Sequence, residues 1–99
     1  MAVEAIWNDQ VIAHSDRTVV VEGNHYFPAE DVYTSMLERT RATSECPWKG
    51  TAHYYTVECD DGRIENGAWC YPNPKKEAAH IKNMFAFGSD VEVSQVADA

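Results

Sequence analysis

The side chains best suited to chemistry gather in ten consecutive residues, 46–55, which read Cys-Pro-Trp-Lys-Gly-Thr-Ala-His-Tyr-Tyr. This segment carries a thiol, an indole, an ammonium, an imidazole and two phenols. Its proline and glycine favour a bend, because proline restricts the backbone and glycine frees it. We therefore expect any function of the chain to involve this segment.

A cysteine nucleophile is the first kind of chemistry that the segment would support. Cys46 precedes a proline at the bend, and the nearby ammonium of Lys49 would lower its pKa. His53 would act as the base if the bend folds back, and Lys49 would stabilise developing negative charge. The alternative is that Cys46 is a small buried apolar residue that helps to position the bend.

Ligand binding is the second kind of chemistry, and it depends on the lysine between Trp48 and Gly50. Glycine lets a ligand or another backbone approach closely, and the tryptophan ring offers a flat face. Trp48-Lys49-Gly50 is therefore predicted to form the wall of a pocket for an anionic or planar ligand. The alternative is a solvated lysine whose methylene stem covers Trp48.

Aromatic residues continue along the strand that is predicted after the bend. Successive side chains on a strand point to opposite faces, so His53 and Tyr55 share one face and Tyr54 takes the other. Trp69 and Tyr71 share one face of the predicted partner strand. Cross-strand aromatic pairs stabilise sheets, so most of these rings are expected in the core. Buried tyrosines need hydrogen-bond partners, so one or two hydroxyls are expected to line a polar pocket.

The cysteine spacing argues against a metal centre. The chain has neither a Cys-x-x-Cys nor a His-x-x-x-His pattern, which are typical of zinc ligands. A zinc site assembled from Cys46, His53, Cys59 and Cys70 is the weaker alternative. We therefore expect no metal and no cofactor.

Composition limits the partners and the location of the protein. A net charge of −8 disfavours nucleic acid and anionic membranes as partners. The three cysteines are odd in number and widely spaced, which favours reduced thiols over disulfides. The sequence shows neither a signal peptide nor the apolar run of about 18 residues that a membrane-spanning helix needs. We expect a cytoplasmic protein, monomeric or homodimeric, with a small-molecule ligand.

Short β-prone runs between turn residues predict a mainly β fold in which residues 1–99 form one domain. The expected strands are 3–7, 10–13, 18–22, 25–27, 51–59, 63–71, 84–87 and 91–93. Asn8-Asp9 predicts a tight hairpin, and Asn66-Gly67 predicts a bulge. The compact core is expected over about 3–93, with a loose tail at 94–99.

Two short helices are expected between these strands. Apolar residues recur at helical spacing within 29–38, which also begins with acidic residues, so a short helix or a helical loop is expected there. In the second segment, 74–83, Asn73 would cap the helix and Pro74 would take its first position.

Four groups of residues together resemble a known family. They are Glu22-Gly23-Asn24-His25-Tyr26-Phe27-Pro28, the segment 46–55, Ala68-Trp69-Cys70-Tyr71 with Pro74, and Ile81 with Ala86-Phe87. In this order and spacing they resemble the domain of unknown function 427 family, from about residue 3 to residue 93. The resemblance implies a β-tent-like fold of two small antiparallel sheets with one or two short helices.

The resemblance also bears on chemistry. Relatives elsewhere in that architecture often hold zinc through paired Cys-x-x-Cys motifs, which this chain lacks. Some members of the family carry a nucleotidyltransferase label. That reaction needs carboxylates around Mg²⁺ and a backbone that cradles phosphate, and neither is visible here.

Residues that match the family motifs and carry polar or aromatic chemistry form a candidate ligand pocket. They are Tyr26, Trp48, Lys49, Tyr54, Tyr55, Trp69 and Tyr71. Binding of a small anionic or planar ligand is the expected function. The alternatives are a structural or protein-interaction domain, and an enzyme that is based on Cys46 and His53 or is nucleotidyltransferase-like.

Overall fold

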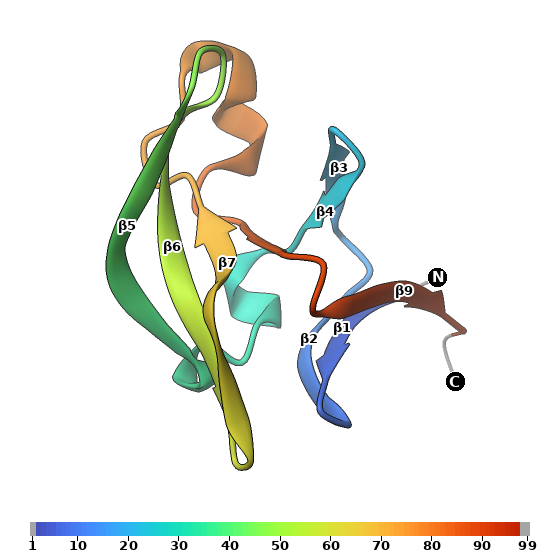
Figure 1. Cartoon of the computed structure of the whole chain (residues 1–99). Helices are drawn as coiled ribbons and strands as arrows, with labels where there is room; N and C mark the ends of the chain where they lie inside the picture. The colour runs from blue at the N-terminus through green and yellow to red at the C-terminus, as the bar shows by residue number, and fades with distance from the viewer. Residues whose placement is uncertain (1, 98–99) are drawn as a thin grey trace.

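The computed structural model describes residues 2–97, which form nine strands and three 3₁₀ helices (Figure 1). In chain order these are β1 (Ala2–Trp7), β2 (Gln10–Ser15), β3 (Val19–Val21), β4 (Asn24–Tyr26), η1 (Ala29–Asp31), η2 (Thr34–Met36), β5 (Leu37–Cys46), β6 (Gly50–Cys59), β7 (Gly62–Cys70), η3 (Lys76–Ile81), β8 (Phe85–Phe87) and β9 (Glu92–Val96). The prediction of a mainly β fold is confirmed.

The strands form three antiparallel sheets within the described residues, so the prediction of two sheets is wrong. Their strand orders are β2-β1-β9, β3-β4 and β5-β6-β7-β8. The β3–β4 hairpin stands apart because Pro28 cannot donate a backbone hydrogen bond and ends its second strand. Phe27 still exchanges two backbone hydrogen bonds with Phe85, at 2.7 and 2.9 Å, which ties the hairpin to the large sheet.

The predicted tight turn and bulge are both confirmed. Asn8 and Asp9 have φ of 56° and 60°, as a two-residue hairpin turn requires. In β7 the pairing shifts around Asn66, whose φ is 55°. A β-carbon on the next residue, Gly67, would lie 2.9 Å from the Ile64 side chain, so a residue without one is needed there.

Of the short helix or helical loop predicted at 29–38, the structure forms the helical loop and not a continuous helix. Only two single turns form there, and Leu37 begins β5. Val32 instead forms a bridge with Ala13, and the Tyr33 N–H donates to the Ile12 carbonyl at 2.8 Å. Contacts with β2 therefore override the helical spacing.

The second predicted helix forms over a shorter range, and the C-terminal strand is longer than predicted. η3 covers Lys76–Ile81 and buries Ala78 and Ile81. β9 pairs with β1 through Val96, so Ser94–Val96 of the expected loose tail belong to a sheet. Residues 98 and 99 of that tail lie outside the described residues.

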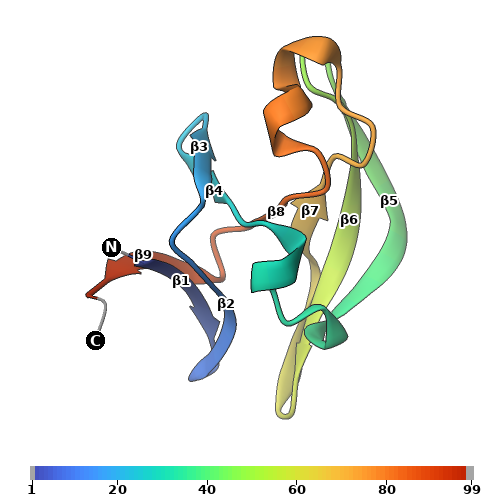
Figure 2. The same ribbon diagram turned by 180° about the vertical axis from the view of Figure 1, so that it is seen from behind.

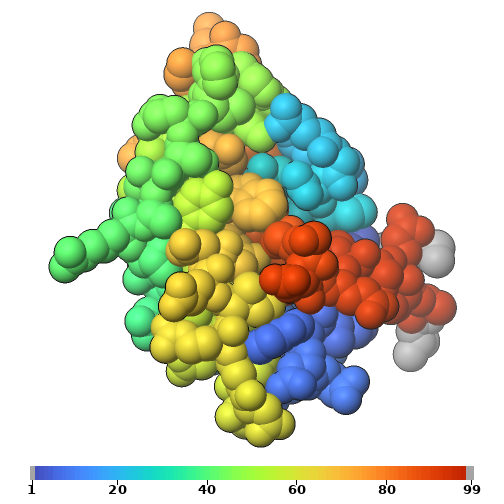
Figure 3. Space-filling view, viewed as in Figure 1, coloured from blue at the N-terminus to red at the C-terminus, as the bar shows by residue number. Residues whose placement is uncertain are grey.

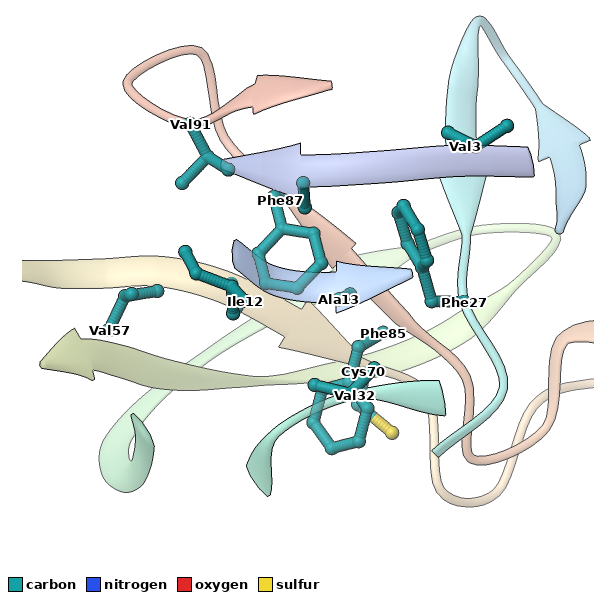
Figure 4. Close-up of a cluster of buried hydrophobic side chains, with 12 residues drawn as sticks. Val3, Ile12, Ala13, Phe27, Val32, Val57, Cys70, Phe85, Phe87 and Val91 are labelled. Atoms are coloured by element: carbon teal, nitrogen blue, oxygen red, sulfur yellow. The ribbon is translucent and has the colours of Figure 1, made fainter. Parts of the chain in front are cut away.

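Two hydrophobic cores lie on opposite faces of the large sheet, because neighbouring residues of β6, β7 and β8 point to opposite sides. The first core comprises Val3, Ala5, Ile12, Ala13, Phe27, Val32, Val57, Ala68, Cys70, Phe85, Phe87 and Val91 (Figure 4). The second core comprises Val21, Tyr26, Ala52, Tyr71, Ala78, Ile81 and Ala86. Figure 2 shows η3 and the β3–β4 hairpin near the same end of the large sheet.

No helix among residues 2–97 has the length and apolar character that a membrane crossing requires.

Candidate functional site

Lys49 lies in the short loop between β5 and β6, and its side chain is only 9% exposed. The ammonium lies 5.6 Å from the ring centroid of Trp48 and 5.4 Å from that of Tyr71, distances at which a cation is attracted to an aromatic face. It also forms an ion pair with Glu22. Lys49 is thus a buried, paired cation, unlike a solvated surface lysine.

The loop that carries Lys49 is held tightly against the segment after β7. The Lys75 N–H donates to the Lys49 carbonyl at 2.9 Å, and the Lys75 ammonium donates to the Pro47 carbonyl at 2.6 Å. Gly50 has φ of 110°, and a β-carbon there would lie 3.4 Å from the Asn73 carbonyl oxygen. The backbone conformation therefore favours glycine, whereas a β-carbon would meet the neighbouring chain at an ordinary contact distance.

Glu22 is absent from the residues predicted for the site, yet it is the anion that neutralises Lys49. It occupies the first position of the two-residue turn between β3 and β4, with φ of 53°. That left-handed conformation favours Asn, Asp or Gly. Glu22 nevertheless stands there, and its carboxylate accepts hydrogen bonds from Lys49 and, at 3.5 Å, from Trp48 Nε1. The unusual choice of glutamate at this turn is the sequence feature that points to Glu22 as a site residue.

The protonation equilibria of Glu22 and Lys49 favour the ion pair. Burial by itself would lower the pKa of Lys49, but the hydrogen bond to Glu22 and the nearby Tyr26 and Tyr71 oxygens outweigh it and raise that pKa. The hydrogen bond from Lys49 also lowers the pKa of Glu22. Both groups are therefore charged at neutral pH.

Tyr26, Trp69, Tyr71 and Tyr54 form an aromatic layer beside this pair, on the face of the second core. Tyr26 is fully buried, and its hydroxyl accepts a hydrogen bond from Trp69 Nε1 at 3.1 Å. Its ring lies 6.5 Å from that of Tyr71, and the Tyr54 ring lies 6.3 Å from that of Trp69. The Tyr54 hydroxyl is hydrogen-bonded to Ser44 at 2.9 Å. Six of the seven predicted pocket residues thus share one side of the sheet.

Tyr55 is the seventh, and the structure does not bring it to this layer. It lies on the opposite face of the sheet, where its ring packs edge-on against Phe85 at a centroid distance of 5.1 Å. The register explains the difference, because Tyr54 pairs with Trp69 whereas Tyr55 pairs with Ala68.

Cys46 and His53 also lie on opposite faces. Cys46 pairs with Gly50 and packs against the second core, whereas His53 pairs with Thr43 and contacts Arg39. A sulfur and an imidazole on opposite sides of a sheet have no direct path for proton transfer. The arrangement therefore does not supply the nucleophile and base that a Cys46 enzyme would need.

The cysteine thiols are free, and two of them are buried. Burial raises the pKa of Cys70 to about 11, and burial together with Asp60 raises the pKa of Cys59. Neutral buried thiols are poor nucleophiles and poor metal ligands. Among residues 2–97, no three His, Cys, Asp or Glu side chains gather closely enough to hold a metal ion.

An open cleft of about 320 Å³ lies beside Trp69, between the β3–β4 hairpin and the segment that leads into β9. It is lined by Gly23, Asn24, His25, Trp69, Phe87, Gly88, Ser89, Val91 and Val93. Figure 3 shows the end of β7 (gold) reaching the surface between the hairpin (cyan) and the C-terminal segment (red). Of the predicted pocket residues, only Trp69 lines this cleft.

Comparison with known proteins identifies the chain at the level of family. No curated protein matches it significantly. One family model matches residues 1–98, which is nearly the whole chain, in agreement with the resemblance of its motifs. The chain therefore belongs to the family described as Domain of unknown function (DUF427).

Proposed function

We propose that this domain binds a small planar molecule in the cleft beside Trp69. The observation that carries the proposal is the partly buried indole of Trp69, which forms one wall of an open cleft of about 320 Å³. Ligand sites typically measure about 300–1,000 Å³, so this volume suits a small ligand.

The lining of the cleft supports a ligand with an apolar body and a polar edge. Phe87, Val91 and Val93 offer apolar surface, and His25 and Ser89 offer hydrogen-bonding groups. Polar and apolar groups contribute about equally to the exposed lining, so the polar groups can orient a ligand whose body packs on the apolar ones. His25 is itself oriented, because its Nδ1 is hydrogen-bonded to the Thr18 hydroxyl at 2.9 Å.

The aromatic layer of Tyr26, Trp69, Tyr71 and Tyr54 makes the Trp69 wall of the cleft rigid. The Trp69 indole N–H is held by the buried Tyr26 hydroxyl, so the ring cannot rotate without breaking a hydrogen bond. A preorganised wall reduces the entropy lost on binding. The sequence pattern led us to expect the ligand at Lys49, whereas the cleft favours a site at the other end of the same aromatic layer.

Nuclear magnetic resonance of the ¹⁵N-labelled protein tests this function. The chain has three tryptophans, so their indole N–H signals are separate reporters: Trp69 for the cleft and Trp7, which does not line it, as a control. A library of planar heteroaromatic fragments should yield ligands that shift the Trp69 signal and leave Trp7 unchanged.

A matched pair of variants at the cleft rim sharpens the test. Ser89→Phe should fill the cleft and weaken binding at least tenfold, about 1.4 kcal/mol, whereas Asp90→Phe should leave it unchanged because Asp90 does not line the cleft. Both residues are exposed, so both variants should fold. Absence of any ligand at Trp69, or equal binding by both variants, would instead favour a structural or protein-interaction domain.

A further inference from the structure

Lys49 and Trp48 present two hydrogen-bond donors to one carboxylate. The Lys49 ammonium donates to one oxygen of Glu22, and the Trp48 indole N–H donates to the other at 3.5 Å. Two donors of which one is charged match the two oxygens of a carboxylate. We call Lys49, Trp48 and the Tyr71 ring the carboxylate receptor.

The receptor is rigid, whereas Glu22 comes from a less constrained element. The loop that carries Lys49 is tied by two hydrogen bonds to Lys75. Glu22 lies at the tip of a two-stranded hairpin, and a β-carbon on the adjacent Gly23 would meet no atom within 4 Å. The lysine side chain is 9% exposed, but that of Glu22 is 51% exposed. The anion can therefore return to water while the cation stays in place.

The backbone of Glu22 also carries a cost that its side chain must offset. A φ of 53° is unfavourable for a residue with a long side chain and no local hydrogen bond of the Asn or Asp kind. Strained residues of this type cluster at ligand sites and switch regions. The contacts of the carboxylate with Lys49 and Trp48 account for a glutamate at a turn position that otherwise favours Asn, Asp or Gly.

We propose that the carboxylate receptor is a binding site for small planar carboxylates, which Glu22 occupies in the free protein. The incoming carboxylate takes the two hydrogen bonds, and Glu22 turns outward into solvent. The ring of the ligand stacks on Trp48, which is 37% exposed. This site is separate from the cleft beside Trp69 and does not depend on it.

Charge favours a carboxylate over a phosphate. Lys49 provides a single positive charge, which a monoanion neutralises completely. A dianionic phosphate would leave excess negative charge in a chain whose net charge is already −8. The exposed ring of Trp48 likewise suits a ligand with a flat apolar body.

Replacing Glu22 with glycine is the decisive experiment, because it removes the internal competitor and suits the left-handed turn. A tethered group competes at an effective concentration on the order of millimolar, so its removal should raise the apparent affinity. Glu22→Gly should bind benzoate at least tenfold more tightly than the native chain does. Acetate should bind Glu22→Gly more weakly than benzoate, and chloride at equal ionic strength should not bind.

The tryptophan signals and two further variants identify the site. Benzoate should shift the Trp48 indole N–H of Glu22→Gly more than those of Trp7 and Trp69. Glu22→Gly combined with Lys49→Met should lose the binding, and Asp61→Asn, which removes one exposed negative charge elsewhere, should behave as the native chain.

Two results would overturn the proposal. One is equal benzoate affinity of Glu22→Gly and the native chain, and the other is a shift at Trp69 alone. The second result would leave the cleft proposal standing, so the two proposals fail separately. The Trp48 signal of Glu22→Gly decides the matter even if the Lys49→Met combination does not fold.

Discussion

Cys70 should make the fold less stable as the pH rises from about 9 to about 11. Its side chain is buried in the first core, where it pairs across the sheet with Phe85, and the residue is only 4% exposed (Figure 4). Burial penalises the charged thiolate and raises the pKa of Cys70 from 9.0 to about 11, although the nearby Arg39 opposes this rise.

The direction and size of the effect follow from proton linkage. In the unfolded chain the Cys70 thiol loses its proton near pH 9, whereas in the folded chain it keeps the proton until about pH 11. Between these values the unfolded state binds fewer protons, so the free energy of unfolding falls as the pH rises. The gap between the two pKa values corresponds to about 3 kcal/mol, a large part of the stability of a small domain.

Urea denaturation at pH 8, 9, 10 and 11 measures this loss in the native chain and in Cys70→Ala. Other groups with raised pKa values, such as Tyr71 and Cys59, contribute to both proteins. The difference between the two curves therefore reports Cys70 together with its effect on Tyr55, whose pKa is raised by burial and by Cys70. The native chain should lose about 2 kcal/mol more than Cys70→Ala between pH 9 and 11, because part of the full difference falls below pH 9 and above pH 11. Cys46→Ala is the control and should follow the native curve. Parallel curves for the native chain and Cys70→Ala would refute the assignment of Cys70 as a buried neutral thiol.

Further predictions concern the ion pair and the loop beside it. Glu22→Gln should lower the melting temperature more than Lys49→Met does. Loss of the Glu22 charge leaves the buried Lys49 ammonium without its counter-ion, whereas loss of Lys49 leaves a Glu22 carboxylate that water can reach. The reverse order of melting temperatures would contradict the unequal burial of the two side chains. Gly50→Ala should destabilise the fold by about 1–3 kcal/mol in urea denaturation, because its φ of 110° is strained for alanine. Gly23→Ala should cost less, since its φ of 81° lies nearer the left-handed region that other residues can adopt, and equal losses would contradict this ranking.

Local chemistry in the sequence accounts for the parts of the fold that were predicted correctly. Asn8 and Asp9 make a tight turn because both residues tolerate left-handed backbone. Asn66-Gly67 makes a bulge for a similar reason, and Pro28 ends β4 because it has no N–H to donate. Each of these features depends on one or two neighbouring residues, so no knowledge of distant contacts is needed.

The helix predicted at 29–38 shows where local pattern is insufficient. Val32, Met36 and Leu37 fall at i, i+4 and i+5, as on one face of a helix, but in the fold Val32 bridges to Ala13 and Leu37 pairs with Val57. Contacts with other strands stabilise extended backbone there, and a helix as short as ten residues has little stability of its own.

The sequence by itself determined the family and the mainly β character, and it placed Lys49 next to an aromatic ring, that of Trp48. Only the tertiary structure decided that Lys49 pairs with Glu22, which lies 27 positions earlier in the chain. It also decided that Tyr54 faces Trp69 while Tyr55 turns to the other core. Strand register selects the face of every side chain, and a shift of one residue reverses it, so register depends on long-range pairing that no short motif specifies.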